Sequence, residues 1–96
     1  MSDKPLFIPL KTEYYEAFLD GSKTTEYRKF GPRWNFETCK AGRRVTISKG
    51  YGKSHRRHGT ITHFCRSGLL PKAWSEVYGD HPGPVACITI ELDKKS

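Results

Sequence analysis

Short segments with strand-type patterning dominate this chain and limit what it can fold into. Alternating apolar and polar residues, typical of strands with one buried face, recur in short runs bounded by glycine, proline and polar residues. Five such segments are found, at residues 6–11, 24–30, 43–49, 60–65 and 85–92. A helical period occurs twice, at residues 13–20 and in a segment that begins at Pro71. The order strand–helix–strand–strand–strand–helix–strand predicts an α+β fold, a small and partly closed mixed β-barrel with two helices at its ends.

The length of 96 residues leaves room for one core, so residues 1–96 are expected to form a single domain. No apolar run is long enough to cross a bilayer, and the first residues lack the apolar stretch of a secretory signal. Three cysteines, an odd number, argue against a disulfide framework and favour a reducing compartment. We therefore expect a cytoplasmic protein without a membrane partner.

The first helix has clear sequence signals at both ends. Thr12 is expected to be its N-cap, and Gly21 stands where a left-handed C-cap residue belongs. Its apolar face is expected to consist of Tyr14, Tyr15, Phe18 and Leu19. Pro9 cannot donate a ladder hydrogen bond and marks residues 6–11 as an edge strand or a bulge. Residues 50–59, which are rich in glycine and bases, are expected to form a long hairpin loop.

The basic residues are concentrated in the middle of the chain. The net charge is +7, but residues 23–66 hold twelve Lys or Arg and only two acids, so this stretch carries about +10. A basic stretch between mildly acidic ends indicates a polyanionic partner, although a solubilising surface would also account for the net charge. The segregation of the charge favours the polyanion.

A lysine, a carboxylate and a guanidinium follow the turn at Gly21. Strand alternation places Glu26 and Arg28 on one face, close enough to pair, and Lys23 lies at the corner before them. Such a group is suited to binding a phosphate or a polar base, or to acid–base chemistry by Lys23 and Glu26. From the spacing alone, a surface ion pair is the alternative.

The pattern Gly21-x-Lys23-x4-Arg28, between a first helix and a second strand, resembles the signature of the ASCH family. The opening FIPLKTEYYEAFLDGSKTTEYRK is similar to the first strand, helix and second strand of that family. The segment CKAGRRVTIS is similar to the glycine turn before its next core strand. ASCH domains are related to PUA RNA-binding domains, and the resemblance covers nearly the whole chain.

The resemblance implies a PUA-like barrel with a cleft lined by Lys23 and Arg28, and binding of RNA or nucleosides. One branch of the family deacetylates N4-acetylcytidine, and another is described as a ribonuclease. The deacetylating branch has a threonine three residues after the lysine, where this chain has Glu26. Either Glu26 serves as the required carboxylate, or that activity is absent.

Aromatic residues are interleaved with the basic stretch, as in proteins that stack bases beside phosphate contacts. Trp34 and Tyr51 are expected to stack on bases, whereas Phe36 is expected to plug the end of the barrel. The residues expected to bind nucleic acid or ligand are Arg28, Lys29, Arg33, Trp34, Arg43, Arg44, Tyr51, Lys53, Arg56 and Arg57.

Metal binding is not expected. His55, His58, His63 and Cys65 are close in sequence, but their spacing fits no structural zinc pattern. His63 and Cys65 are instead expected to share a strand face with Ile61. No cofactor is implied.

The sequence therefore predicts an RNA- or nucleotide-binding domain, with Lys23 and Glu26 as catalytic residues if the bound RNA is cleaved. Two alternatives remain: an amidohydrolase acting on a modified nucleoside such as N4-acetylcytidine, and a non-catalytic reader of modified bases. Single-stranded DNA is a further candidate partner.

Overall fold

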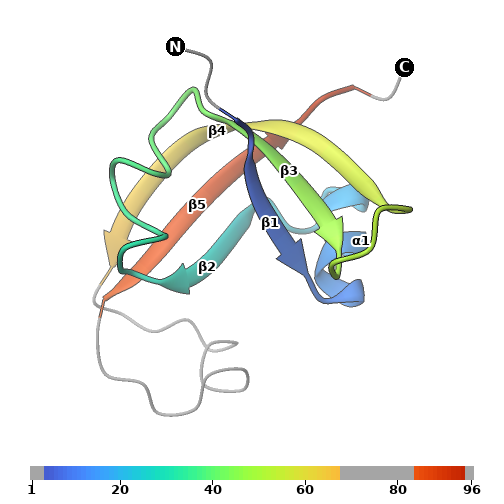
Figure 1. Cartoon of the computed structure of the whole chain (residues 1–96), viewed down its shortest axis with the longest axis horizontal. Helices are drawn as coiled ribbons and strands as arrows, with labels where there is room; N and C mark the ends of the chain where they lie inside the picture. Colours follow the sequence, from blue (N-terminus) through green and yellow to red (C-terminus); the bar gives the residue numbers. More distant parts are fainter. Residues whose placement is uncertain (1–3, 68–83, 95–96) are drawn as a thin grey trace.

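One curled sheet of five strands forms the frame of the protein, and the computed structural model describes residues 4–67 and 84–94 of it (Figure 1). In chain order the elements are β1 (Leu6–Leu10), α1 (Thr12–Asp20), β2 (Thr25–Lys29), β3 (Arg44–Lys49), β4 (Arg56–Ser67) and β5 (Val85–Leu92). The strands lie in the order β1-β3-β4-β5-β2. β1 pairs with β3 in parallel and the other pairs are antiparallel, so the sheet is mixed and β1 and β2 are its two edges.

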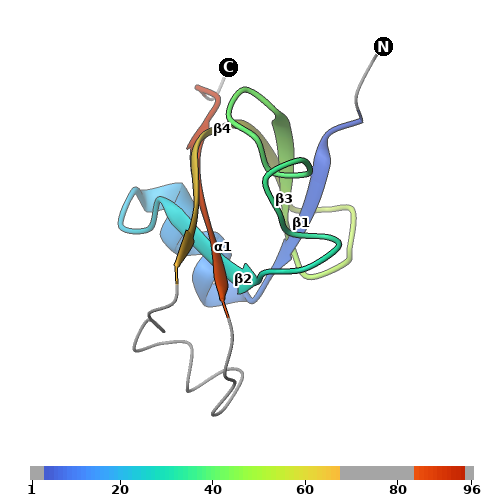
Figure 2. The same cartoon turned by 90° about the vertical axis from the view of Figure 1, so that its left-hand side faces the viewer.

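The main bend of the sheet lies within strand β4. Its first residues pair with β3, and from Gly59 onward the strand pairs with β5. At the bend the backbone of β5 comes so close that a Cβ built on Gly59 would lie 2.6 Å from the carbonyl oxygen of Glu91. Only glycine fits there without a shift of the chain. As a result the two halves of the sheet, β1 with β3 and β4 with β5, face each other (Figure 2).

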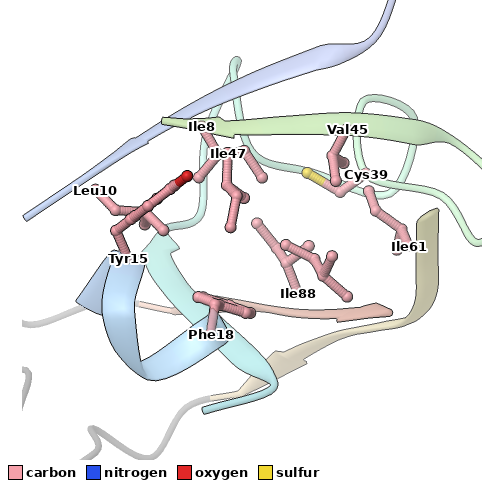
Figure 3. Packing of buried hydrophobic residues seen from close by; sticks show 10 residues of the cluster. Ile8, Leu10, Tyr15, Phe18, Cys39, Val45, Ile47, Ile61 and Ile88 are labelled. Carbon is pink, nitrogen blue, oxygen red and sulfur yellow. The ribbon is translucent and has the colours of Figure 1, made fainter. Parts of the chain in front are cut away.

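The core fills the space between these two halves, and helix α1 adds two rings to it (Figure 3). Inward-facing aliphatic residues come from every strand except β2, and Tyr15 and Phe18 enter from the helix. The fully buried side chains of the cluster are Ile8, Cys39, Val45, Ile47, Ile61 and Ile88. Burial of these inward-facing residues explains the alternation in the sequence, although in β3 the polar Thr46 and Ser48 between them are buried as well.

Helix α1 ends as expected but begins differently. Gly21 adopts the left-handed conformation (φ 86°) at the C-cap, which confirms the prediction. The N-cap is Lys11 rather than Thr12, because the Lys11 carbonyl accepts the first helical hydrogen bonds from Tyr14 and Tyr15. Leu19, expected on the apolar face, is exposed because the helix buries a narrower stripe against the barrel.

The expected partly closed mixed barrel is confirmed in its five strands and α1, and Pro9 does lie on an edge strand. The predicted second helix, from Pro71, lies outside the described residues. The hairpin loop is shorter than predicted, because residues 56–58 pair with β3 and begin β4. The placement of His63 and Cys65 beside Ile61 is wrong: a bulge between Ile61 and His63 turns them to the opposite face. Within residues 4–67 and 84–94, α1 is the only helix, and it is too short and too polar to cross a bilayer.

Candidate functional site

The opening between the two edge strands is bridged by the side chain of Arg28. Arg28 lies opposite Ala86 on β5, on the inner face of the sheet. Its Nη2 donates a hydrogen bond of 2.5 Å to the carbonyl oxygen of Pro9, on the other edge strand. Since an edge strand has backbone groups without a ladder partner, a guanidinium here takes the place of a neighbouring strand.

Glu26 is buried beside Arg28 and pairs with two cations. It lies opposite the core residue Ile88, and its side chain is 9% exposed. Its Oε2 accepts a 2.8 Å hydrogen bond from Nε of Arg28, and its Oε1 lies 3.5 Å from Nζ of Lys23. The side chains of Arg28 and Lys23 are 16% and 19% exposed, so all three charges are largely withdrawn from water. We call the opening between the edge strands β1 and β2 the seam, and Lys23, Glu26 and Arg28 the seam cluster.

Lys23 is held in place by the end of α1. The left-handed turn at Gly21 lets the Lys23 amide bond to the Ala17 carbonyl at 3.1 Å, which returns the chain over the helix. The ammonium then lies among three aromatic rings, with Nζ at 5.1 Å from the centroid of Tyr14, 5.3 Å from Tyr27 and 5.7 Å from Phe18. The cation–π contacts and the ion pair with Glu26 hold the Lys23 side chain in one position.

A second group of side chains, contributed largely by the segment after β2, alternates guanidinium groups with aromatic rings. The guanidinium carbons of Arg28 and Arg33 lie 4.9 and 5.7 Å from the Trp34 ring, and that of Arg66 lies 5.3 Å from Phe30. The rings of Phe30, Phe36 and Phe64 contact one another at centroid distances of 5.0–6.4 Å. We call this group the basic–aromatic rim, and its members are Phe30, Arg33, Trp34, Phe36, Phe64 and Arg66.

Phe36 does not plug the barrel as predicted. It is 57% exposed, whereas Trp34 of the same loop packs against the core, and Asn35 fixes the loop by hydrogen bonds. The Asn35 side chain bonds to the carbonyls of Gly31 and Pro32 and accepts from the amides of Glu37 and Thr38. Cys39, at the end of the loop, enters the core instead, and burial raises the pKa of its thiol. Phe36 thus lies outside, on the rim.

A hollow of about 400 Å³ adjoins the seam cluster at Lys23. Its volume is in the range of small-molecule sites. Its apolar lining residues are Phe18, Ile90 and Leu92, and its polar ones are Lys23, Thr24, Thr62, His63, Thr89 and Glu91. Hydroxyl, imidazole and charged groups of this kind can bond to a sugar or a base.

Besides Arg28, four of the arginines expected to bind a ligand form hydrogen bonds within the protein, among them Arg56, which donates to the Gly52 carbonyl. Arg43 donates to the carbonyls of Thr38 and Lys4, and Arg57 to the carbonyl of Asp93. Arg44 forms a two-pronged pair with the Asp93 carboxylate, and its hydrogen bonds hold the pKa of that carboxyl below its usual value. These contacts fasten the loop and the end of β5 to the sheet.

Another predicted group lies apart from the seam cluster, at the β3–β4 turn. Tyr51 is 82% exposed and contacts Phe7, and the Arg56 guanidinium carbon lies 5.0 Å from the same Phe7 ring. Phe7 belongs to the outer face of β1, since its neighbour Ile8 faces the core. Lys53 is exposed in the turn itself, and Lys29 is exposed at the end of β2. Of the predicted site residues, the structure therefore brings together Lys23, Glu26, Arg28, Arg33 and Trp34.

Sequence reasoning missed the aromatic surroundings of the cluster. Nothing in the sequence analysis assigns Tyr14 and Tyr27 to the site or pairs Arg66 with Phe30. One signal was available: Tyr14 and Phe18 are four residues apart, so they lie on one helix face that leads to Lys23. The described part of the chain contains no cluster of three or more His, Cys, Asp or Glu side chains that could hold a metal ion.

Comparison with known proteins gives structural neighbours only. No family model and no curated protein matches the sequence. Two crystal structures of single-substitution mutants of ZmASCH from Zymomonas mobilis match with TM-scores of 0.65 and 0.66, at 16% and 15% identity. Each match covers 88% of this chain, which spans about two thirds (66–67%) of ZmASCH. At this identity the likeness concerns the fold.

Proposed function

We propose that this chain, which has the fold of ASCH domains, binds single-stranded RNA or a nucleotide derived from it at the seam cluster. The observation that carries the proposal is the contact between cations and an aromatic ring there. Glu26 pairs with both Lys23 and Arg28, and the Arg28 guanidinium lies against Trp34, which Arg33 also contacts. Proteins that bind single strands combine cations for the phosphates with rings on which bases stack.

The three charges of the seam cluster have separate tasks in this proposal. Glu26 cancels one positive charge and holds both cations in fixed positions, so that their remaining donors point at a ligand without reorganisation. The excess charge then attracts a phosphate. Phe36, the exposed ring of the loop, stacks on an unpaired base, and Trp34, which is half-buried and packs against the core, lies two residues before it.

The direct test is binding of a short fluorescent single-stranded RNA, measured by anisotropy at several salt concentrations. We expect log Kd to rise linearly with log salt, with a slope near 0.7 for each phosphate neutralised. We expect Lys23→Ala to weaken binding by about tenfold or more, the loss of one charge-assisted contact, while Lys23→Arg retains most of the affinity. A DNA of the same sequence measures the contribution of the ribose hydroxyl.

The matched control removes an equal charge elsewhere. Lys11 is exposed and makes no side-chain capping bond, so Lys11→Ala is expected to change affinity less than twofold. Equal losses in Lys11→Ala and Lys23→Ala would mean diffuse attraction to a basic surface and would refute a site at the seam. Cleavage of the RNA by the wild type and not by Lys23→Ala would extend the proposal to a ribonuclease.

The hollow beside Lys23 supports a second candidate, hydrolysis of a modified nucleoside such as N4-acetylcytidine. In that reaction the Lys23 ammonium, which lines the hollow, stabilises the developing negative charge, and Glu26, which lies outside the hollow on the inner face, holds the ammonium in place. Mass spectrometry of the nucleoside after incubation tests this directly. Turnover that survives in Lys23→Ala would exclude the assignment.

A further inference from the structure

Two of the three cysteines lie directly opposite each other on neighbouring strands. Cys65 of β4 and Cys87 of β5 are register partners in the antiparallel pair. Both are on the outer face of the sheet, because the next pair along, Phe64 with Ile88, faces the core. The bulge near Thr62 creates this match by shifting the register of β4.

The backbone geometry of such a pair suits a disulfide. Directly opposed residues of antiparallel strands have Cα atoms about 4.5–5.5 Å apart. Disulfides form across Cα separations of about 4.4–6.8 Å, so β4 and β5 need not move apart or together. The two thiols already interact: burial, and then a hydrogen bond with Cys65, raise the pKa of the Cys87 thiol to about 11.

We propose that Cys65 and Cys87 form a two-thiol redox site that accepts an intramolecular disulfide from a small disulfide such as oxidised glutathione. Cys65 is exposed and reacts first, whereas Cys87 is half-buried. The Cys65 thiolate attacks the small disulfide, forms a mixed disulfide and releases one thiol. The Cys87 thiolate then attacks the Cys65 sulfur and displaces the second thiol, so the protein loses two protons and two electrons and one small disulfide becomes two thiols.

The test is equilibration of the reduced protein with glutathione buffers of increasing oxidised fraction, followed by acid quenching, alkylation and peptide mass spectrometry. We expect one product, a monomer that has lost two hydrogens and carries the Cys65–Cys87 bond. Cys39, which is fully buried, serves as an internal control and should be alkylated only after unfolding. The oxidised form should melt roughly 5–15 °C above the reduced form, since the bond restricts the unfolded chain.

Two variants separate the steps. Cys87→Ser should accumulate the mixed disulfide of Cys65 with glutathione, and Cys65→Ser should stay largely unmodified over the same time. A wild type that stops at the mixed disulfide, forms disulfide-linked dimers or remains reduced in fully oxidised glutathione would overturn the proposal. The site faces away from Glu26 and Arg28, so its failure would leave the proposed function untouched.

Discussion

The sheet is closed by different means on its two sides. Between β3 and β5 the closure is made by backbone, because β4 is long enough to pair with both strands and bends at Gly59. Between the edge strands β1 and β2 it is made by side chains, chiefly the bond from Arg28 to the Pro9 carbonyl. A ladder of backbone bonds is satisfied by itself and has no net charge. A closure by side chains places charged groups in a partly buried position, where salt screens ion pairs less than at the surface.

This difference explains why the seam, and not the β4 bend, is the candidate site. The bend requires glycine, which has no side chain that could bind a ligand. The seam requires charged hydrogen-bond donors that span the distance between two strands, and such donors are also suited to binding an anion. The fold and the proposed function therefore depend on the same residues at the seam, and experiments on the two closures should separate the structural role from the proposed binding role.

Of the two closures, the bend is expected to show the larger loss of stability. Gly59→Ala places a Cβ 2.6 Å from the Glu91 carbonyl oxygen, and the backbone of two paired strands must shift to relieve the contact. We expect the free energy of unfolding to fall by about 2–3 kcal/mol, the cost of overpacking, measured by urea denaturation. Gly52→Ala is the control, because nothing lies within 4 Å of its added Cβ. Equal stability of the two variants would show that the bend does not depend on glycine.

At the seam we expect a smaller loss of stability, and we expect the effects of changing Arg28 and Glu26 to depend on each other. Arg28→Met keeps packing against Trp34 but leaves Glu26 with one cation and Pro9 without its donor. We expect a loss of about 2 kcal/mol, because a largely buried carboxylate loses a charged hydrogen bond.

A double-mutant cycle distinguishes the structural role of this pair from its binding role. Glu26→Gln combined with Arg28→Met should recover about 1 kcal/mol relative to the sum of the single changes, since the carboxylate and its guanidinium partner are removed together. Lys23 loses its carboxylate partner in Glu26→Gln and in the double variant alike, so that loss cancels in the cycle. Binding of RNA should remain weak in both the single and the double variant. Additive losses in stability would contradict the coupling that the 2.8 Å contact indicates.

Local signals in the sequence were sufficient for part of this site. Period-two alternation correctly placed Glu26 and Arg28 on one face, and the glycine after the helix correctly marked the turn that positions Lys23. These features depend on residues close together in the chain. The fold class could be predicted for the same reason, from the apolar periodicity of the segments that form the five strands and α1.

The missing parts depend on contacts between distant segments. Arg28 bonds to Pro9, nineteen residues earlier, and no local pattern identifies a backbone carbonyl as its partner. The bulge that turns His63 and Cys65 outward arises where β4 passes from one partner strand to another, and alternation by itself cannot show it. Phe36 was misplaced because an aromatic residue in a loop has the same sequence signal whether it faces the core or the solvent.

Phe36→Ala now tests the rim rather than the core. Since the ring is 57% exposed, we expect unfolding to become easier by less than about 1 kcal/mol. RNA affinity should fall by about tenfold if one base stacks there. Phe18→Ala, which removes a buried ring, should cost about 3–5 kcal/mol and provides the contrast. Unchanged RNA affinity in Phe36→Ala would remove the loop from the binding surface.

The smallest effect is expected from the exposed pair Arg44–Asp93, which joins β3 to the residue after β5 on the backbone-closed side. Hydrogen bonds from Arg44 lower the pKa of Asp93 from 3.8, its value in an unfolded chain. A depressed folded-state pKa stabilises the protein above pH 3.8, and this contribution is lost as the pH falls through the folded value. Asp93→Asn should therefore lower the melting temperature slightly at pH 7, and the difference from wild type should disappear in acid below the folded pKa.

Because both side chains are about half exposed, roughly 1 M salt should also remove most of the difference in melting temperature between Asp93→Asn and the wild type. The loss of stability in Arg28→Met that comes from charge should persist in high salt, since the seam cluster is withdrawn from water. Equal salt sensitivity of the Arg44–Asp93 and Arg28–Glu26 pairs would contradict the contrast between the two closures.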